Sequence, residues 1–353
     1  MAKRATMTDI ANRVGVSQAT VSLVLNGVQN ARVSAATRKR VMEAAEALGY
    51  RKTQRSLPPG TGARVIGLLI DDVTTTPFAM QFIEGARDEA TLHDCIVSVF
   101  CTRRDPALED AALELLSTTR LQGVLYASLV TQAVTPPERL RGVPAILLNC
   151  HDARRTFPSV LPGDVSGAFA ATEALLQAGH RRIAHLAGER WMEAARDREL
   201  GYRRALASWD VPVDPDLIIV GGYTFDGGRE IAARLLERDD PPTALFCFND
   251  RMAMGAFDAI RARGLSVPED MSVVGYDDEE LVRYMQPPLS TVVLPHDEMA
   301  RWAVSALFDP TVVGARSPVR LKMECALVER GSIGAPRASR LLLPSAAGRQ
   351  AVG

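Results

Sequence analysis

The side chains best suited to recognise another molecule by hydrogen bonding stand near the start of the chain, at Gln18 and Thr20. Both follow Ser17, a residue type that begins helices, so they occupy the N-terminal end of a short helical pattern. A glutamine amide carries a donor and an acceptor and can pair with both polar atoms on the major-groove edge of adenine. Ser22 and Asn26 are better suited to phosphate oxygens. These residue types predict base reading at positions 18 and 20, with phosphate contacts around them.

Three short helical patterns surround these residues. Thr8 is a good N-cap for the first, which Gly15 can end, and Ser17 is a good N-cap for the second. Ser34 caps a third pattern whose apolar residues recur at the spacing of a buried helical stripe: Val41, Ala44, Ala45 and Leu48. Two short helices joined by a glycine-containing turn and supported by a third form a helix-turn-helix, whose second helix fits the major groove of DNA.

The charge distribution indicates a polyanionic partner for this part of the chain. Residues 1–55 carry ten lysine and arginine residues against three acidic ones, a net charge of +7, although the whole chain of 353 residues has a net charge of −1. A small basic unit joined to a larger acidic one is typical of a protein that binds nucleic acid through the first unit only. The alternative is a solvated basic tail, and the capped helical patterns argue against it.

From residue 64 onward, short apolar runs alternate with amphipathic stretches. We expect strands at 65–70, 96–100, 123–126, 145–148, 183–186, 244–248 and 272–275. We expect helices at 78–92, 108–118, 165–178, 194–209, 228–238 and 252–263. This alternation predicts parallel sheets covered by helices on both faces, and about 270 residues are many for one sheet, so two subdomains are expected. Ligands of this architecture bind at the carboxyl ends of strands, here in a cleft between the two halves.

The sequence gives little support for catalysis or metal binding. It contains no P-loop, no GxGxxG fingerprint and no GxSxG elbow. The five histidines lack metal-ligand spacing, and His180 is interpreted as structural. The five cysteines are scattered and include no CxxC motif, which favours reduced cytosolic thiols. Asp71 and Asp72 follow a predicted strand and could touch a ligand, but two carboxylates alone do not define acid–base chemistry. We therefore predict no enzyme, no cofactor and no metal.

No segment approaches the 18 or so apolar residues of a membrane span, and no apolar stretch follows the charged N-terminus as it would in a signal peptide. We expect no membrane partner and a cytoplasmic location, at the nucleoid when the protein is bound to DNA.

The first fifty residues resemble the opening of the LacI family of bacterial repressors. The resemblance rests on Gly15-Val16-Ser17, Ala19-Thr20-Val21-Ser22 and Leu25-Asn26-Gly27 in register, followed by Ala47-Leu48-Gly49-Tyr50. It implies DNA contacts from the helix-turn-helix and the linker after it: Thr8, Ser17, Gln18, Ala19, Thr20, Ser22, Leu23, Asn26 and Leu57. Leu23 departs from the family, because many members carry a base-reading arginine there, so specificity would depend more on Gln18 and Thr20.

The linker at residues 51–63 departs further from the family pattern. Family members usually hold here a short hinge helix that orders on DNA, with a leucine in the minor groove. Pro58-Pro59 would prevent a helix from continuing through that point. Two interpretations stay open: Leu57 is an apolar wedge between base steps, or the linker is a flexible tether.

The resemblance continues to about residue 330 through blocks at 179–184, 201–206, 249–256 and 267–278, and implies the fold of periplasmic sugar-binding proteins. By position it implies an effector site lined by Thr76, Phe78, Asn149, Arg196, Tyr223, Asn249 and Asp277. Arg196 matches the effector-clamping arginine of the family. Plainer interpretations exist: Asn249 and Asp277 as helix caps, Arg196 in a surface ion pair, and Tyr223 in the core.

These patterns divide the chain into a headpiece (1–50), a linker (51–63), an effector-binding and dimerisation domain (64–333) and a disordered tail (334–353). The large domain is expected to comprise an N-subdomain, about 64–161 and 292–316, and a C-subdomain, about 162–291 and 317–333. The tail lacks heptads, so a coiled-coil tetramer is not expected.

The predicted function is a transcription regulator, most simply a repressor, that binds a pseudo-palindromic operator in double-stranded DNA as a homodimer. Its affinity is controlled by a small molecule, for which a sugar is the first choice and a purine or nucleoside the alternative. A solute-binding protein for a transporter also fits the large domain but leaves the helix-turn-helix unexplained. A sugar-processing enzyme has no supporting residue.

Overall fold

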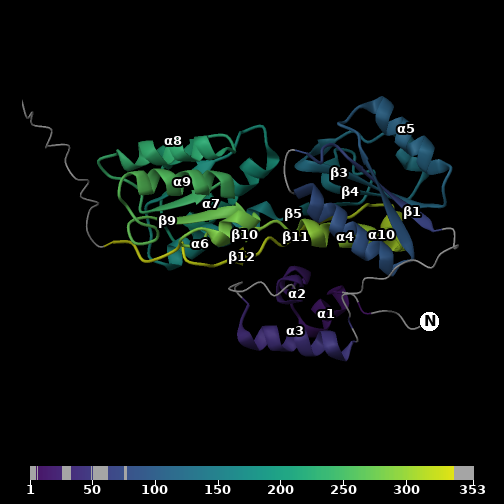
Figure 1. The fold of residues 1–353 in the computed structure, drawn as a ribbon, viewed down its shortest axis with the longest axis horizontal. Coiled ribbons are helices and arrows are strands. Elements are labelled where there is room, and N and C mark those ends of the chain that lie inside the picture. Colours follow the sequence, from purple (N-terminus) through teal and green to yellow (C-terminus); the bar gives the residue numbers. More distant parts are fainter. Residues whose placement is uncertain are drawn as a thin grey trace, which may run out of the picture. The chain divides into compact units, whose positions relative to one another are not determined.

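The computed structural model describes residues 5, 7–25, 33–48, 50, 63–74 and 78–337. By its internal contacts the chain divides into two compact units. Unit 1 consists of Met1–Gly167, Trp191–Asp197 and Val293–Ala326, and unit 2 consists of Ala168–Arg190, Arg198–Val292 and Leu327–Gly353. Each unit contains one six-stranded sheet with helices packed on it (Figure 1).

Three helices form the headpiece within unit 1: α1 (Met7–Val14), α2 (Gln18–Leu25) and α3 (Ala35–Ala47). Gly15 has a φ of 73°, a left-handed conformation that ends α1 and that glycine adopts without a Cβ penalty. Ser17 accepts a hydrogen bond from the backbone N–H of Thr20 at 3.1 Å, and Ser34 caps α3 in the same way. Both predicted caps are confirmed. The predicted cap of α1 is wrong, because Thr8 is the second residue of that helix.

The headpiece helices share one apolar core. Ile10, Val21 and Val41, one from each helix, are fully buried in it. Burial of each such side chain stabilises the fold by about 1.5–3 kcal/mol. The Arg40 guanidinium on α3 also donates to the carbonyl of Val14, the last residue of α1. This bond satisfies one of the carbonyls that a helix leaves without an internal partner at its C-terminus.

The sheet of unit 1 has the strand order β11-β5-β4-β3-β1-β2, with every pairing parallel. Its strands are β1 (Arg64–Ile70), β2 (Cys95–Cys101), β3 (Leu121–Val134), β4 (Ala145–Asp152), β5 (Ser159–Pro162) and β11 (Arg320–Met323). One apolar core contains side chains of α4 (Phe78–Leu92) and α10 (His296–Leu307), and a second contains side chains of α5 (Pro106–Ser117). Burial on both faces explains why β1 is a continuous apolar run rather than an alternating one.

The sheet of unit 2 has the strand order β12-β10-β9-β8-β6-β7. Its strands are β6 (Ile183–Ala187), β7 (Ile218–Val220), β8 (Ala244–Cys247), β9 (Ser272–Asp277), β10 (Ser290–Val293) and β12 (Leu327–Val328). The pairs formed by β6 to β9 are parallel, whereas β10 and β12 pair antiparallel. The longer helices between Gly163 and β10 are α6 (Asp164–Gln177), α7 (Glu193–Ser208), α8 (Phe225–Leu236) and α9 (Asp250–Ala262).

Helices α8 and α9 approach each other unusually closely, because glycines lie at their contact. A Cβ at Gly228 would lie 2.2 Å from the carbonyl oxygen of Met252, and a Cβ at Gly255 would lie 2.0 Å from that of Phe225. Real Cβ atoms do not come so near to backbone, so each glycine allows a helix contact that alanine would prevent.

The described C-terminal segment of unit 2 is attached to its sheet by side-chain hydrogen bonds. Nε2 of His180 lies 2.9 Å from the carbonyl oxygen of Gly334. The Ser332 hydroxyl donates to the carbonyl of Val273 at 2.6 Å and accepts from the backbone N–H of Ser290 at 2.8 Å. Burial lowers the pKa of His180, so its ring is neutral at pH 7, in agreement with a structural role.

The structure divides the large domain differently from the sequence prediction. Residues 317–326 were expected in the C-subdomain, but they lie in unit 1 because β11 pairs in parallel with β5. Residues 162–167 and 191–197 also belong to unit 1. Most of the predicted linker and tail lies outside the described residues.

Candidate functional site

Most of the predicted DNA-reading residues come from α2 or the residue before it. Gln18 is the first residue of this helix, and Ala19, Thr20, Ser22 and Leu23 follow. Ser22 and Leu23 are buried in this structure, at 2% and 7% exposed, so their contact with DNA stays a prediction. The Thr20 hydroxyl lies 2.9 Å from that of Ser17, which caps the helix. A hydroxyl can both donate and accept, so Thr20 can take part in the cap and in a second hydrogen bond.

The structure gives less information about the remaining predicted DNA contacts. Thr8 belongs to the first turn of α1. Asn26 and Leu57 lie outside the described residues, and so does Pro58-Pro59. Their roles, and both interpretations of the linker, therefore stay predictions.

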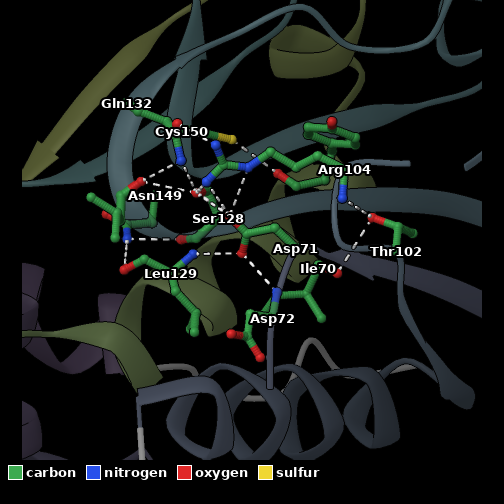
Figure 2. A network of polar contacts seen from close by, with 12 residues as sticks. Ile70, Asp71, Asp72, Thr102, Arg104, Ser128, Leu129, Gln132, Asn149 and Cys150 are labelled. Atoms are coloured by element: carbon green, nitrogen blue, oxygen red, sulfur yellow. Dashed lines mark hydrogen bonds and ion pairs between the residues drawn. The ribbon is translucent and has the colours of Figure 1, made fainter. Parts of the chain in front are cut away.

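A network of polar contacts lies at the carboxyl ends of the strands of unit 1, with Asp71 at its centre (Figure 2). Asp71 follows β1 and is 8% exposed. Its Oδ2 accepts from the Ser128 hydroxyl at 2.7 Å and from Nη2 of Arg104 at 2.6 Å, and its Oδ1 accepts from the backbone N–H of Leu129 at 2.9 Å. Charge-assisted bonds of this kind are among the stronger ones in proteins. The carboxylate that could have touched a ligand is thus engaged within its own unit.

Arg104 extends this network to Gln132. Its Nη1 donates to Oε1 of Gln132 at 2.7 Å, and Nε2 of Gln132 donates to the Ser128 hydroxyl at 2.5 Å, so the contacts form a closed ring (Figure 2). Arg104 has a φ of 59°, a conformation uncommon for a residue other than glycine. Its side-chain bonds to Asp71 and to Gln132 of β3 compensate for that unfavourable backbone conformation.

Asn149 is buried in the same network, and both atoms of its amide, Nδ2 and Oδ1, have partners within the protein. Nδ2 donates to the carbonyls of Ser128 at 2.9 Å and Leu129 at 3.1 Å, and Oδ1 accepts from the Thr131 hydroxyl at 2.7 Å. These partners lie where the pairing of β3 with β4 shifts register, between Ala127 and Gln132. The structure thus gives Asn149 a role in stabilising an irregular strand, and its contact with an effector stays a prediction.

Phe78 is a further predicted effector contact that the structure describes, and its ring packs within unit 1. It begins α4, and its ring lies edge-on to that of His296, with centroids 5.3 Å apart. The Phe82 ring lies 4.5 Å from the same imidazole, which it supports from the core. The Phe78 ring is therefore supported by packed aromatic side chains. Thr76 lies outside the described residues.

The main cluster of unit 2 is centred on Arg198, which the sequence prediction missed. Arg198 is 4% exposed, and its Nη1 donates to the carbonyl of Phe248 at 2.6 Å and lies 3.5 Å from Oδ1 of Asp277. The guanidinium carbon lies 3.6 Å from the ring centroid of Tyr276 and 4.6 Å from that of Phe248. A planar cation packed on aromatic rings is held in one orientation, which suits it to bind hydroxyls or a carboxylate.

Asp277 ends β9 in an unusual conformation. Its φ is 114° and that of Asp278 is 55°, so two successive residues other than glycine have positive φ. The interpretation of Asp277 as a helix cap is wrong, because the next helical turn, η3 (Glu280–Tyr284), has Glu279 at its N-cap position. Asp278 turns away to Arg283, at 2.8 Å, and to Arg330. Asp277 is the acidic group that approaches Arg198.

Asn249 and Tyr223 meet at the start of α9. Oδ1 of Asn249 accepts from the backbone N–H of Met252 at 2.9 Å, so its interpretation as a helix cap is confirmed. Its Nδ2 donates to the carbonyl of Tyr223 at 2.9 Å, which positions the loop after β7. The interpretation of Tyr223 as a core residue is wrong, because its side chain is 47% exposed.

Arg196, the predicted effector clamp, is exposed and contributes to unit 1, whereas Arg198 is buried in unit 2. A signal for this difference was present in the sequence. The buried residues of α7 include Ala195, Arg198 and Tyr202, which have the i, i+3, i+7 spacing of one helix face, and Ala194, one turn before Arg198. Arg196 does not belong to that stripe.

The described residues contain no group of three or more His, Cys, Asp or Glu side chains that could hold a metal ion. Within the same ranges, no helix is both long and apolar enough to cross a membrane. None of the five cysteines, all of which lie in the described ranges, forms a disulfide.

These features define a class: a small helix-turn-helix headpiece joined to an α/β protein with polar clusters at the carboxyl ends of its strands. The sequence profile of the family described as "Bacterial regulatory proteins, lacI family" matches residues 6–52. The profile described as "Periplasmic binding protein-like domain" matches residues 172–333. The predicted fold class is thereby confirmed.

Two curated proteins are similar over most of the chain. The HTH-type transcriptional repressor CytR of Escherichia coli (strain K12) is 33% identical over 339 residues, which cover 93% of this chain and 96% of that protein. The Ribose operon repressor of Haemophilus influenzae is 32% identical over 305 residues, which cover 86% of this chain and 91% of that protein.

Two solved structures share the fold. One is the lac repressor dimer bound to operator and the anti-inducer ONPF, with a TM-score of 0.64, 27% identity and coverage of 94% of this chain and 100% of that one. The other is the transcriptional regulator CelR in complex with cellobiose, with a TM-score of 0.63, 30% identity and coverage of 93% and 100%. The chain belongs to the LacI family of bacterial transcription regulators. Its family identity also supports the prediction that it is not an enzyme.

Proposed function

We propose that the protein is a repressor that binds a pseudo-palindromic operator as a homodimer, with α2 of each subunit in the major groove. The observation that carries this proposal is the geometry of α2, which Ser17 caps directly after the glycine turn at Gly15. A family relative is a dimer on its operator, which supports the same assembly here. We place this activity in the bacterial cytoplasm, at the nucleoid when the operator is occupied.

Gln18 and Thr20 read base edges in this proposal, and Leu23, which is buried in this structure, offers no further hydrogen bond. The other proposed contacts position the headpiece on the DNA and comprise Thr8, Ser17, Ala19, Ser22, Asn26 and Leu57. A single headpiece with so few base contacts discriminates weakly against genomic DNA. Dimerisation doubles the number of contacts and requires two half-sites at the right spacing, which supplies the missing specificity.

The effector we propose is a small sugar, and unit 2 gives the strongest support. Arg198 can donate to hydroxyl oxygens, and Asp277 can accept from hydroxyl groups beside it. The exposed ring of Tyr223 offers an apolar face for a sugar ring. Arg198 takes the role first assigned to Arg196. The other proposed contacts are Thr76, Phe78, Asn149 and Asn249, of which the last two have most of their amide groups engaged by protein.

An effector can change operator affinity only if it binds the DNA-competent and DNA-incompetent conformations with different affinity. The sign of the change in operator affinity shows whether the effector releases the repressor from DNA or recruits it to DNA.

Operator binding is tested by selecting binding sites from random duplexes and measuring affinity by gel shift at 150 mM salt. We expect enrichment of a pseudo-palindrome that the protein binds at least about 1,000-fold more tightly than a scrambled duplex of the same composition. Equal affinity for both duplexes would refute the proposal and leave a solute-binding protein as the better interpretation.

The effector is tested by thermal shift with cellobiose, D-ribose, adenosine and cytidine. A ligand present at about 100 times its Kd stabilises the native state by about 2.7 kcal/mol, which raises the Tm measurably. A response to the sugars alone supports the proposal, and a response to the nucleosides alone moves the effector to the alternative class. If no sugar or nucleoside raises the Tm while operator binding is intact, the effector part of the proposal is wrong.

A further inference from the structure

Asp250 is a fully buried carboxyl group to which the proposed function assigns no role. It is the first residue of α9, and its side chain is 0% exposed. The Thr291 hydroxyl donates to its Oδ1 at 2.6 Å, and the backbone N–H of Glu279 donates to its Oδ2 at 2.8 Å. Neither partner is a cation, and burial raises the pKa of the carboxyl. A buried carboxyl with neutral partners costs stability, so its two bonds must serve a purpose that an apolar residue could not.

The bond donated by the backbone N–H of Glu279 connects Asp250 with the turn that carries Asp277. Asp277 and Asp278 have positive φ values, each of which costs of the order of 1–3 kcal/mol in a residue other than glycine. Glu279 follows immediately, and its backbone N–H is the group that Asp250 holds. The bond from Asp250 therefore anchors the turn at the residue after its two strained positions. Asp277 lies 3.5 Å from Arg198 in this conformation.

Strand β9 has a glycine where it passes the same carboxyl. A Cβ at Gly275 would lie 2.2 Å from Oδ1 of Asp250 and 2.8 Å from Cδ2 of Leu289. Any larger residue at position 275 would thus displace the carboxyl or the strand. The absence of a side chain there allows Asp250 to sit against β9, two residues before Asp277.

The bond donated by the Thr291 hydroxyl connects Asp250 with β10. Thr291 is the second residue of this strand, and the chain leaves unit 2 after Val292 to enter unit 1 at Val293. One carboxyl group therefore connects the turn after β9 with the strand that leads out of unit 2. Asparagine has the same shape and can keep both contacts: its amide oxygen can accept from the backbone N–H of Glu279, and its amide nitrogen can donate to the Thr291 hydroxyl, which reverses that bond.

We propose that Asp250 is a positioning residue of the effector site, which holds the Asp277 turn opposite Arg198 and couples that turn to β10. The inference rests on the proposed effector role of Arg198 and Asp277. Through this carboxyl, a displacement of the turn by a bound molecule is passed to Thr291 and so to the strand that leaves unit 2.

The test is hydrogen–deuterium exchange of the full-length protein, which needs no effector. Asp250→Ala removes both bonds, and we expect exchange of the peptide containing Glu279 to accelerate about tenfold or more, with faster exchange in β10. Asp250→Asn can keep both bonds, so it should restore exchange to within about threefold of wild type. Asp258→Asn is the matched control, because Asp258 is an exposed carboxylate on the same helix, and it should change neither peptide.

Thr291→Val is the second variant and guards against misfolding of Asp250→Ala. It removes one bond, and we expect faster exchange in β10 with a smaller change at Glu279. D-ribose and adenosine serve as thermal-shift probes: a Tm rise seen in wild type should return in Asp250→Asn and be lost in Asp250→Ala, while operator affinity without a probe stays within threefold. Unchanged exchange at Glu279 in Asp250→Ala, or equal disruption by alanine and asparagine, would overturn the proposal. If wild type responds to neither probe, the effector proposal loses support, and the exchange data still decide the role of Asp250.

Discussion

Arg196 and Arg198 are two residues apart on one helix, and the structure gives them different surroundings. Residues at i and i+2 lie on different sides of an α-helix, so only one of the two can lie on the face buried in unit 2. The buried one, Arg198, is packed on two aromatic rings and approaches Asp277. Its planar guanidinium is essential to that packing, and a lysine would keep only the charge.

We therefore expect Arg198→Lys to weaken the affinity for whichever tested sugar or nucleoside binds wild type by about 10- to 100-fold, which corresponds to about 1.4–2.8 kcal/mol. Operator affinity in the absence of ligand should change little. Isothermal titration calorimetry measures the first quantity and gel shift the second. Arg196→Ala is the control and should leave ligand affinity within threefold. If Arg196→Ala abolishes binding and Arg198→Lys does not, the assignment made from the sequence was the better one.

Gln18 is the residue with the most direct prediction for DNA. Because a bidentate contact to a base discriminates by about 1–3 kcal/mol, Gln18→Ala should weaken specific binding at least about tenfold and leave binding to a scrambled duplex almost unchanged. Competition gel shifts with both duplexes measure the two effects. An equal loss on both would show that Gln18 contacts only the DNA backbone.

His185 makes the stability of unit 2 depend on pH. Its ring is fully buried on β6, with centroids 4.6 Å from Phe246 and 5.4 Å from Tyr202, and burial lowers its pKa from 6.5 to about 4. A histidine whose pKa is lower in the folded state contributes stability above pH 6.5, and this contribution is lost as the pH falls towards 4. We expect this residue to reduce the free energy of unfolding by about 3 kcal/mol between pH 6.5 and 4.

The measurement is urea unfolding of wild type and His185→Phe at several pH values. The difference in unfolding free energy between the two proteins isolates His185 from the carboxyl groups that titrate in the same range. That difference should shift in favour of the variant as the pH falls. A constant difference would show that the buried ring is protonated in the folded state or titrates elsewhere.

Among the elements, those with a long periodic pattern were predictable. The helix expected at 78–92 is α4, with the same bounds, because its 15 residues alternate apolar and polar faces over four turns. The strands β5, β7, β10, β11 and β12 were missed, since they are two to four residues long and too short to show a period. The helix α10 was also missed. The bulge in β3 was not predictable either, because it depends on hydrogen bonds from Asn149 on the next strand.

The candidate site was predictable only where a local pattern of residues marks a position in it. The position of Asp277 at a strand end and of Gln18 at a helix start follows from local patterns. The network of Asp71, Arg104 and Ser128 joins residues far apart in the sequence, so it depends on the register of three strands. The burial of Asp250 follows only from the packing of β9 and β10 against it, which no local pattern reveals.

At the scale of the elements, the close contact between α8 and α9 gives a prediction about stability. Gly228→Ala would place a Cβ 2.2 Å from the Met252 carbonyl, and relief requires the two helices to separate. We expect a loss of about 2–3 kcal/mol in the free energy of unfolding, measured by urea titration. Gly142→Ala is the control, because no atom lies within 4 Å of a Cβ built there, and it should change stability by less than about 0.5 kcal/mol. Similar losses in both variants would mean that the helices do not meet as closely as described.

At the scale of the whole molecule, the separation of charge determines how each function responds to salt. The first 55 residues carry a net charge of +7 in a chain of net charge −1, so counterion release affects the headpiece and its DNA. We expect operator affinity to fall roughly a thousandfold between 50 and 200 mM salt, measured by fluorescence anisotropy. Affinity for a neutral sugar should change less than twofold over the same range. A flat salt dependence of DNA binding would contradict the proposed phosphate contacts.

The hydrogen bonds that attach residues 332–334 to the sheet of unit 2 have a practical consequence for handling the protein. A chain ending at Arg337 would keep the bonds of His180 to Gly334 and of Ser332 to Val273 and Ser290. A chain ending at Gly331 would leave a strand carbonyl and a strand amide without those partners, each at a cost of about 1–3 kcal/mol, while His180 would keep its contacts with Ser272 and Thr243. Fluorophores and affinity tags are therefore best joined beyond position 337, whereas trimming that removes Ser332 would harm the packing of unit 2.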